Sequence, residues 1–391
     1  MRTSATGIDI GTYQIKVVVA ESLSGATREL PRISGVGLAE SRGLRHGYVV
    51  NPQEVTKSIM EAVAAAEKAS GTRIKRAFIS VGGISLSGTT AIGSAMISRA
   101  DLEITELDIE KAVEASRIEL SPSATLNRKI IHTIPLNFKI DGKPVLGRPI
   151  GLKGNKFEVK TLFITCLEHH LHDLIEAVEE AGIDVEDVVA APVAASLVTL
   201  SKTQKIAGCV LANIGSETVS IAVFENNIPV SLEVFPIGSN DITNDIALGL
   251  RIPLEEAEGL KLGKLIGISY PKKRLEEIVV ARLSDIFDLI EAHLRKIGRN
   301  GLLPAGIIIT GGGSGIETIE DLAKAALKLP SRIAPVHFGE NSKGQIKDGT
   351  WSVAYGLCLI GLQSENQNNS GFRLVRKTKN NVIAWVKQFL P

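Results

Sequence analysis

The chain has 391 residues, of which 44% are apolar and 22% are charged, and its net charge is +1. This composition is typical of a globular protein long enough for roughly two to four subdomains. The near-neutral charge and the 4% aromatic content argue against a nucleic-acid-binding surface.

The first element is a predicted tight β-hairpin near the N-terminus, where an apolar run enters a Gly-Thr-Tyr-Gln turn and a β-branched run leaves it. Gly11 permits the turn, and the backbone N–H groups of Thr12 and Tyr13 suit a phosphate. Asp9 precedes the turn, where a carboxylate can hold a hydrated cation, and Lys16 adds positive charge. The alternative is an ordinary hairpin with a polar tip.

The next segments predict half of a sheet with a crossover helix. Asn51 is placed as the cap of a helix over residues 52–70, with Pro52 in its first turn and Gly71 after its end. The predicted strands are residues 6–12, 15–21, 32–39, 48–50 and 76–81.

A compact α+β insert is predicted to follow this half-sheet. Residues 84–100 alternate like a half-buried strand pair, and residues 108–119 read as a helix. Further strands are predicted over residues 129–136, 137–142 and 157–164. The insert separates the strand ending near Val81 from a helix over residues 168–182.

Three histidines open that helix, at His169, His170 and His172. A solvated first turn explains them better than zinc does, because no outside cysteine or carboxylate pattern converges on them.

The first hairpin has a second copy that aligns with it without a gap. Asn213 falls on Asp9, and Gly215 and Ser216 fall on Gly11 and Thr12. Glu217 follows in the same turn. Two such hairpins facing each other would hold a polyphosphate from both sides.

A glycine cluster follows later, where a buried strand runs into Gly311, Gly312 and Gly313 and then into a helix predicted from Ile316. These glycines let a flat ring lie against the backbone, and the helix N-terminus favours anions. Before that cluster, residues 274–298 read as a long amphipathic helix.

Repeated strand–turn–strand units followed by strand–glycines–helix resemble the ATPase fold of actin, Hsp70 and sugar kinases. Within the insert, IIHTIPLNFKIDG and PIGLKGNKFEVKTLFIT resemble strand motifs of the FtsA family of bacterial cell-division proteins, an insert that the other three lack. PIGSNDITNDIA and AEGLK resemble two more motifs of that family. The resemblance covers residues 1–363 and 380–391. It implies an α/β, actin-like (ribonuclease H-like) two-half ATPase fold with an inserted α+β (SHS2-type) subdomain and a C-terminal amphipathic helix.

The resemblance also implies a division of the chain. The first half would be residues 1–82 and 166–205, interrupted by the insert at 83–165. The second half would be residues 206–238 and 304–363, interrupted by a subdomain at 239–303. A flexible linker, 364–380, and a membrane-targeting helix, 381–391, would follow.

ATP and Mg²⁺ are the implied ligands, bound between the halves. On this resemblance Gly311 to Gly313 hold the adenine, Glu258 and Lys261 reach the nucleoside, and Mg²⁺ lies near Asp9. An exposed ion pair is an equally good explanation of Glu258 and Lys261. The full set of implied nucleotide residues is Asp9, Gly11, Thr12, Tyr13, Lys16, Asn213, Gly215, Ser216, Glu217, Gly238, Glu258, Lys261, Gly311, Gly312 and Gly313.

Two positions argue for slow hydrolysis. Asn213 stands where the family has an aspartate, and an amide binds a hydrated cation less strongly than a carboxylate. Ala191 stands at the crossover between the halves, where the superfamily often has a residue that positions the attacking water.

The last residues predict a short amphipathic helix after a polar linker. Its apolar side chains fall within an arc of about 160° at helical spacing, and basic residues lie just upstream, which suits an anionic lipid surface. Docking on the protein's own surface is the alternative, and the polar linker argues against it. The predicted membrane-binding residues are Val382, Ile383, Trp385, Val386, Phe389 and Leu390.

The chain otherwise reads as cytoplasmic. Its N-terminus lacks a signal pattern, and no run approaches the ~20 apolar residues of a membrane span. The three cysteines have no metal spacing and indicate buried thiols in a reducing compartment: Cys166, Cys209 and Cys358.

The family resemblance implies a protein that polymerises, tethers the FtsZ ring to the cytoplasmic face of the membrane at the division site, and recruits later division proteins. Two alternatives remain on the sequence. One is an actin-fold adaptor of another envelope machine, such as pilus assembly. The other is a small-molecule kinase of the same fold, which needs a catalytic aspartate facing a substrate pocket; the sequence offers no candidate for it.

Overall fold

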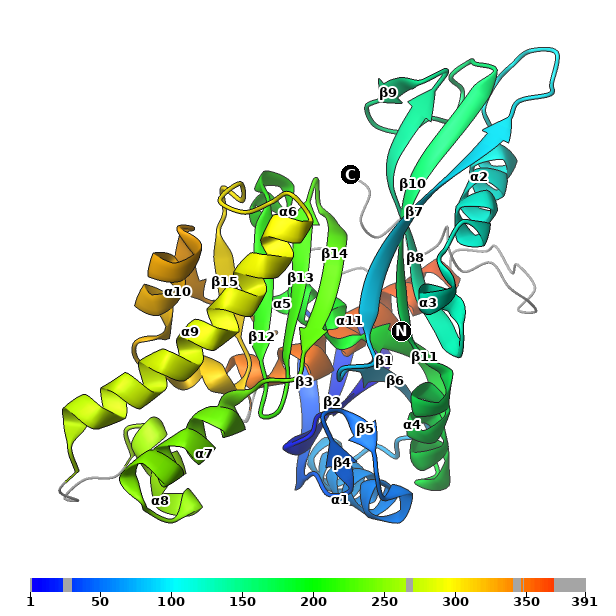
Figure 1. The fold of residues 1–391 in the computed structure, drawn as a ribbon. Coiled ribbons are helices and arrows are strands. Elements are labelled where there is room, and N and C mark those ends of the chain that lie inside the picture. The colour runs from blue at the N-terminus through cyan, green and yellow to red at the C-terminus, as the bar shows by residue number, and fades with distance from the viewer. Residues whose placement is uncertain (1, 24–29, 265–269, 340–345, 347, 369–391) are drawn as a thin grey trace.

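The structure, a computed structural model, describes residues 2–23, 30–264, 270–339, 346 and 348–368. It consists of two α/β halves, each built on a five-stranded sheet, and an insert that rises away from both (Figure 1). The predicted C-terminal helix and most of the predicted linker, residues 369–391, lie outside the described residues.

The first half has the strand order β11-β6-β1-β2-β3. Its strands are β1 (Arg2–Ile10), β2 (Gln14–Leu23), β3 (Arg32–Glu40), β6 (Arg76–Val81) and β11 (Asp184–Ala190). Helix α1 (Pro52–Ser70) begins and ends where the capping residues predict: the Asn51 side chain accepts from the Glu54 N–H, and Gly71 ends the helix at φ 71°. A two-stranded ribbon, β4 (Leu44–Arg45) and β5 (Tyr48–Val49), precedes α1, and helix α4 (Glu168–Glu180) follows the insert.

The second half repeats this plan with the strand order β14-β13-β12-β15-β16. Its strands are β12 (Cys209–Ile214), β13 (Val219–Glu225), β14 (Ile228–Phe235), β15 (Ile307–Thr310) and β16 (Ser331–Ile333). Its helices are α6 (Lys202–Ala207), α7 (Ser239–Leu250), α8 (Leu254–Lys261), α9 (Lys272–Lys296) and α10 (Ile319–Leu327).

The registers of the two halves are equivalent, as the sequence repeat predicts. Asp9 lies opposite Lys16 across the first hairpin, and Asn213 lies opposite Ser220 across the second. The strand parallel to β12 matches as well, since Ala212 pairs with Ile309 just as Ile8 pairs with Ile79. The two turns therefore occupy equivalent ends of the two sheets.

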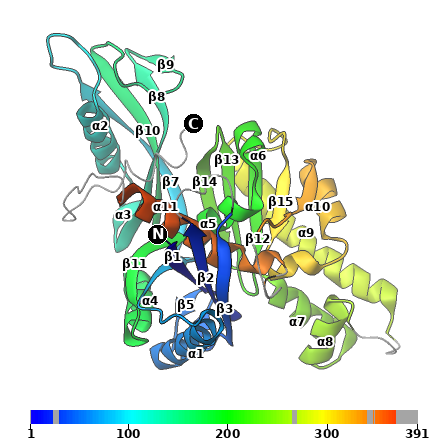
Figure 2. The same cartoon turned by 180° about the vertical axis from the view of Figure 1, so that it is seen from behind.

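Helices α5 (Ala191–Thr199) and α11 (Ser352–Asn368) join the halves. Helix α11 packs on β1, β2 and α5, while α5 contacts β12 and β13 (Figure 2). Helix α11 continues to Asn368, so the backbone is helical over residues 364–368, where the linker was expected to begin.

The insert is a four-stranded antiparallel sheet in the order β7-β10-β8-β9, with helices α2 (Glu106–Ile118) and α3 (Pro122–Thr125). Its strands are β7 (Ser87–Met96), β8 (Arg128–Ile140), β9 (Lys143–Val145) and β10 (Lys156–Leu167). Two strand predictions are wrong here. Residues 84–100 hold one strand instead of a pair, and residues 129–140 form one strand whose register with β10 shifts at Lys160/Thr161 instead of two strands.

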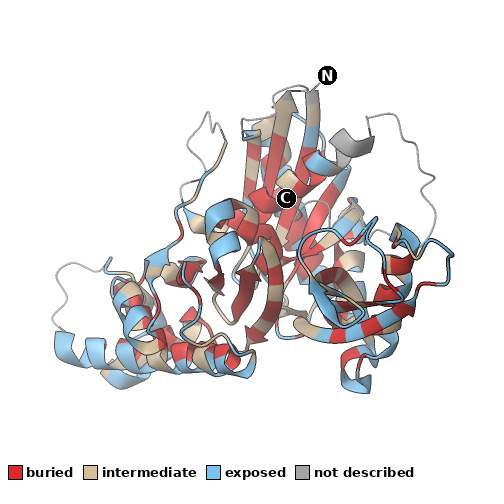
Figure 3. Ribbon diagram, turned by 90° about the horizontal axis from the view of Figure 1, so that it is seen from above, coloured by how far each residue is buried: buried red, intermediate tan, exposed pale blue. Residues whose placement is uncertain are grey.

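The base of the insert is fixed to both halves. The Ala190 N–H at the end of β11 donates to His132 Nε2 on β8 at 3.0 Å. A Cβ on Gly88 of β7 would lie 3.0 Å from the Leu232 N and O atoms of β14. Buried side chains of the insert base and of both halves belong to one core cluster, whereas the outer part of the insert has a core of its own. In Figure 3 the strands are largely buried and the outer helices carry the exposed residues.

Other boundaries differ modestly from the sequence prediction. The helix expected from Ile316 begins at Ile319, because a 3₁₀ turn, η1 (Gly312–Gly315), and an extended Ile316 come first. Asn226 and Asn227 form the two-residue turn between β13 and β14, with both residues at positive φ (51° and 68°).

Candidate functional site

The first hairpin turn presents free backbone donors. Among the described residues, the N–H groups of Thr12 and Tyr13 have no hydrogen-bond partner. The Tyr13 carbonyl accepts from the Ser41 N–H at 3.0 Å, which anchors the loop to the end of β3. The Tyr13 side chain is 64% exposed. The loop is therefore anchored at Tyr13, and its two N–H donors are available to an anion.

Asp9 and Lys16 are the ionisable side chains of this loop, and they lie opposite each other across the hairpin. Ser80 Oγ donates to Asp9 Oδ1 at 2.9 Å and accepts from the Ile10 N–H at 3.3 Å. Burial raises the pKa of Asp9, and Lys16 and Ser80 act against that shift. Burial lowers the pKa of Lys16, and the carboxylates of Asp9 and Asp348 oppose it. Since Asp9 Oδ1 is used by Ser80, Oδ2 is the oxygen that suits a hydrated cation.

The second turn is built in the same way and supported from behind by α7. The Gly215 N–H donates to the Thr218 carbonyl at 2.9 Å, and within the described ranges the N–H groups of Ser216 and Glu217 have no partner. The N–H groups of Ser239 and Asn240, at the start of α7, donate to the carbonyls of Gly215 and Ser216 at 2.9 and 2.8 Å.

Gly238 has a packing role in this loop. A Cβ on Gly238 would lie 2.4 Å from the Ser216 carbonyl oxygen and 2.6 Å from the Glu217 nitrogen. Any side chain here would push α7 away from the turn. Gly238 therefore supports the loop through the backbone contact it allows.

The Glu217 carboxylate points to the first half of the molecule. Its Oε2 accepts from the His46 N–H at 2.6 Å, and the Glu217 carbonyl accepts from His46 Nδ1–H at 3.2 Å. The two halves thus touch directly beside the second turn. Sequence gave no signal for this contact, because His46 lies in a short ribbon far away along the chain.

The three glycines after β15 have different surroundings. A Cβ on Gly311, whose φ is 88°, would lie 2.3 Å from Asn213 Oδ1, and one on Gly313 would lie 2.4 Å from Ile214 Cγ2. A Cβ on Gly312 would have no neighbour within 4 Å among the described residues. Gly311 and Gly313 therefore pack on the second turn, and Gly312 faces open space where a flat ring can lie.

Asn213 and Thr310 occupy the places that Asp9 and Ser80 occupy in the first half. Asn213 pairs with Thr310 across β12 and β15. Thr310 Oγ1 donates to the Gly349 carbonyl at 3.3 Å instead of to a carboxylate. At these equivalent positions the first half has a carboxylate and the second has an amide.

Glu258 and Lys261 play different parts. Lys261 is buried, and its Nζ lies 2.6 Å from Glu258 Oε2, 2.9 Å from Thr243 Oγ1 and 3.2 Å from the Ser239 carbonyl. The Glu258 side chain remains 42% exposed. Protein oxygens therefore accept the hydrogen bonds of the Lys261 ammonium group, and Lys261 holds Glu258 in place. Glu258 is the member of the pair that a ligand can reach.

The three histidines of α4 do not converge. His170 is buried against the Tyr48 ring, with centroids 4.9 Å apart, while the His169 side chain is 88% exposed and lies 3.4 Å from Asp173. In the part of the chain that the structure describes, no group of three or more histidine, cysteine or acidic side chains could hold a metal ion.

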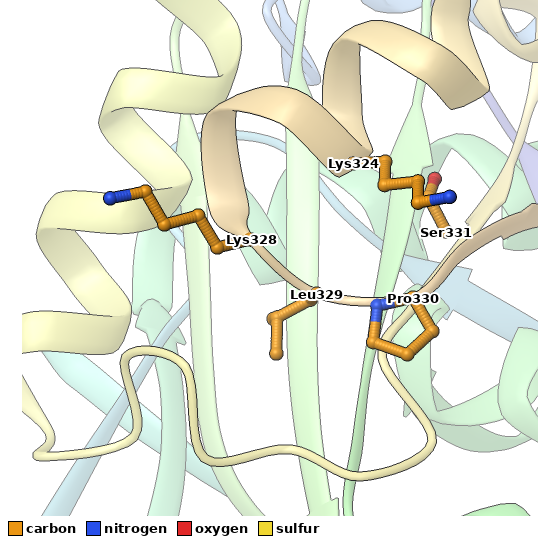
Figure 4. A pocket seen from close by; sticks show the side chains of 5 residues that line it. All are labelled: Lys324, Lys328, Leu329, Pro330 and Ser331. Atoms are coloured by element: carbon orange, nitrogen blue, oxygen red, sulfur yellow. The ribbon is translucent and has the colours of Figure 1, made fainter.

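A surface cavity of about 550 Å³ lies away from the two turns, between the end of α10 and β16 (Figure 4). Its lining residues are Lys324, Lys328, Leu329, Pro330 and Ser331. The lysines stand near the C-terminus of α10, where cations are favourable whether or not a ligand binds. No helix among the described residues is long and apolar enough to cross a membrane.

Comparison with known proteins gives matches along most of the chain. Residues 210–356 match the family model "Cell division protein FtsA", and residues 83–165 match "SHS2 domain inserted in FTSA". The cell division protein FtsA of Borreliella burgdorferi is 31% identical over 392 residues, covering 94% of this chain and 93% of the relative. The corresponding protein of Bacillus subtilis is 32% identical over 374 residues, covering 90% and 81%. That of Pseudomonas aeruginosa is 29% identical over 385 residues, covering 93% and 90%.

Solved structures agree on the fold. A chain of the "PilM-PilN type IV pilus biogenesis complex" matches with a TM-score of 0.68 at 19% identity, covering 92% of this chain and 98% of the other. MreB5 of Spiroplasma citri bound to ADP matches with a TM-score of 0.54 at 14% identity, covering 94% and 99%. The fold is therefore the actin-like two-half α/β fold with an SHS2 insertion, as the sequence predicts.

Proposed function

Since the chain belongs to the FtsA family of cell division proteins, we propose that it is an ATP-binding, polymer-forming tether that holds the FtsZ ring to the cytoplasmic face of the membrane. It would work at the division site as a peripheral membrane protein and recruit later division proteins. The observation that carries the nucleotide part is the pair of equivalent turns, each with two free N–H donors: Thr12 and Tyr13 in one half, Ser216 and Glu217 in the other.

The nucleotide would lie between the halves. The two turns and Lys16 would hold the phosphates, Gly312 would lie under the adenine, and Glu258 would reach the ribose. Gly11 and Gly215 shape the turns, while Gly238, Lys261, Gly311 and Gly313 support the site without touching the ligand. Asp9 fits Mg²⁺ through water, because one of its oxygens is fixed by Ser80 and the other is not.

Turnover would be slow. Asn213 supplies no second carboxylate beside the cation, and Ala191 at the start of α5 supplies no group that orients water. ATP then acts mainly as a ligand that stabilises a particular domain arrangement and polymer state.

Titration of the purified protein with ATP and Mg²⁺ tests this site. We expect saturable ATP binding to the unmodified protein and loss of that binding in Thr12→Pro, where one N–H donor is removed. We also expect the ATP turnover of the unmodified protein to be close to that of Thr12→Pro. A Lys202→Ala variant, on an exposed helix away from the turns, serves as the control. Robust Mg²⁺-dependent ATP turnover by the unmodified protein, well above the turnover of Thr12→Pro, would contradict a mainly structural role of ATP.

The membrane tether is proposed from residues 381–391, with Val382, Ile383, Trp385, Val386, Phe389 and Leu390 as the inserting face and the basic residues before them as the contact with anionic lipid. Co-sedimentation with anionic liposomes tests it. We expect the full chain to pellet, and both a chain ending at Asn368 and Trp385→Glu to stay in solution. Truncation at Asn368 preserves α11. If all three pellet alike, the tail is not the anchor.

The FtsZ contact is tested separately by pull-down with the C-terminal peptide of FtsZ. A chain that binds liposomes but not this peptide would favour an adaptor of another envelope machine. Full-length similarity to cell division proteins and the SHS2 insert support the division role over that alternative and over a small-molecule kinase.

A further inference from the structure

The contact between Glu217 and His46 connects the second turn to the opposite half. The Glu217 carboxylate accepts from the His46 N–H at 2.6 Å, and the free N–H groups of its own loop do not donate to it. Those N–H groups are therefore not used by the contact with His46 and remain available to a phosphate. Both residues are partly buried, and His46 holds a positive φ of 49°, so the contact has a defined geometry.

His46 also contacts the first residues of the insert. The His46 carbonyl accepts from the Ile84 N–H at 3.3 Å. A Cβ on Gly47 would lie 2.4 Å from Gly83 Cα, so the β4–β5 turn lies directly on the chain that enters the insert. His46 thus bonds to the second phosphate turn on one side and to the insert entrance on the other.

The insert entrance is in turn tied to the insert sheet by Arg128. Its guanidinium donates to the Ser85 carbonyl at 2.5 Å and to Ser87 Oγ at 2.8 Å, and also to Thr165 Oγ1 at 2.9 Å and the Thr165 carbonyl at 3.1 Å. These bonds hold together the strands by which the chain enters and leaves the insert. A shift at residues 83–85 therefore moves the base of the insert sheet.

We infer that Glu217 and His46 form a clasp through which occupancy of the second phosphate turn and the position of the insert are coupled. This inference rests on the proposed nucleotide site and adds a regulatory connection to it. When phosphate orders the Ser216-Glu217 backbone, the Glu217 carboxylate is held in reach of His46, and the β4–β5 turn is held on the insert entrance. By reciprocity, a partner that binds and fixes the insert raises the affinity of the turn for nucleotide by the same factor.

Hydrogen exchange of the full chain, with and without ATP and Mg²⁺, tests the clasp. In the unmodified protein we expect ATP to slow exchange at least about threefold both at the second turn, residues 213–218, and at the insert entrance, residues 83–88. In Glu217→Ala, measured at an ATP concentration that saturates this variant, we expect ATP to slow exchange at the second turn and to leave exchange at the insert entrance unchanged. Glu276→Ala, an exposed glutamate of α9, should behave like the unmodified protein.

His46→Gly separates the backbone contact from the ring contact. Glycine keeps the N–H that Glu217 binds and tolerates positive φ, so coupling should persist in this variant. Glu217→Gln keeps an acceptor oxygen without the charge, and it should transmit a weakened effect. This variant also provides the measurement if Glu217→Ala does not fold.

Two results would overturn the clasp. One is a Glu217→Ala protein in which ATP still slows exchange at residues 83–88 as in the unmodified chain. The other is loss of ATP binding in Glu217→Gln, which would make the carboxylate part of the ligand site. Failure of the unmodified protein to bind ATP at all is a different result: it overturns the proposed nucleotide site, and the coupling with it.

Discussion

At the scale of single residues, sequence identified the groups at the turns but not their partners. Asp9, Lys16 and the free donors of both turns lie where the repeat placed them. Ser80, Asp348 and His46 gave no sequence signal, because each meets the site only through tertiary packing. The direction of Glu217 and the burial of Lys261 could not be predicted for the same reason.

The three glycines after β15 give a prediction at this scale. Gly312→Val should weaken ATP binding about tenfold or more, because the side chain would fill the open space beside η1, and it should change the melting temperature little. Gly311→Val should lower the melting temperature strongly instead, because φ is 88° and Asn213 and Ile214 leave no room. ATP titration and thermal melting of both variants measure this. Equal effects of the two substitutions on both readouts would contradict the different roles.

At the scale of helices and strands, sequence predicted the bounds of an element well where capping residues mark its ends, and poorly where the pattern is ambiguous. The helix over residues 52–70 has a capping Asn and a terminal Gly, and its bounds were predicted correctly. The strand over residues 129–140 was divided wrongly into two, because a long strand with a register shift looks locally like two. Strand β16 is a short strand at a sheet edge, and its pairing depends on distant residues that a local pattern does not contain.

The hydrogen bond from the Ala190 N–H of β11 to His132 of β8 predicts how the free energy of unfolding depends on pH. Burial lowers the pKa of His132 to about 3 from its ordinary value of 6.5, so the folded protein keeps this ring neutral and accepting from the Ala190 N–H. Between pH 6.5 and 3 the unfolded chain binds the extra proton, so the free energy of unfolding falls as pH falls. From pH 6.5 to 5 this loss is about 2 kcal/mol. His293, with a pKa of about 4, acts in the same direction.

Chemical denaturation at both pH values measures the effect. His132→Gln should remove about 2 kcal/mol of the pH dependence, whereas His172→Gln, at an exposed position of α4, should leave it unchanged. An unchanged pH dependence in His132→Gln would show that this histidine is not the titrating group.

At the scale of the whole molecule, the order of elements was enough to predict two equivalent halves and an insert. The tail, which sequence predicts to be the anchor, lies outside the described residues, so its role stays a prediction. What sequence could not predict is that the insert base shares a core with both halves, while its outer part has a separate core.

This division of the core predicts that the outer insert can be weakened alone. Phe157 is fully buried there and stacks on Phe138, with centroids 5.7 Å apart. Phe157→Ala should lower the local stability of the insert by ~3–5 kcal/mol, while ATP affinity stays close to that of the exposed-site control Lys160→Ala. Hydrogen exchange of residues 104–113 and ATP titration measure the two quantities. A comparable loss of ATP affinity would mean that the two regions unfold together.

The pairing of Ser87 with Thr165 has a consequence for how such a molecule could arise. The chain leaves the first half and returns to it through antiparallel neighbours about 5 Å apart, a gap that a short hairpin turn can close. An ancestor without the SHS2 domain would thus have needed no change of chain path to acquire it. Leu162 and Ile164 of β10 now belong to the core that the insert base shares with both halves. Deletion of the insert would therefore remove buried side chains that the two halves need for their stability.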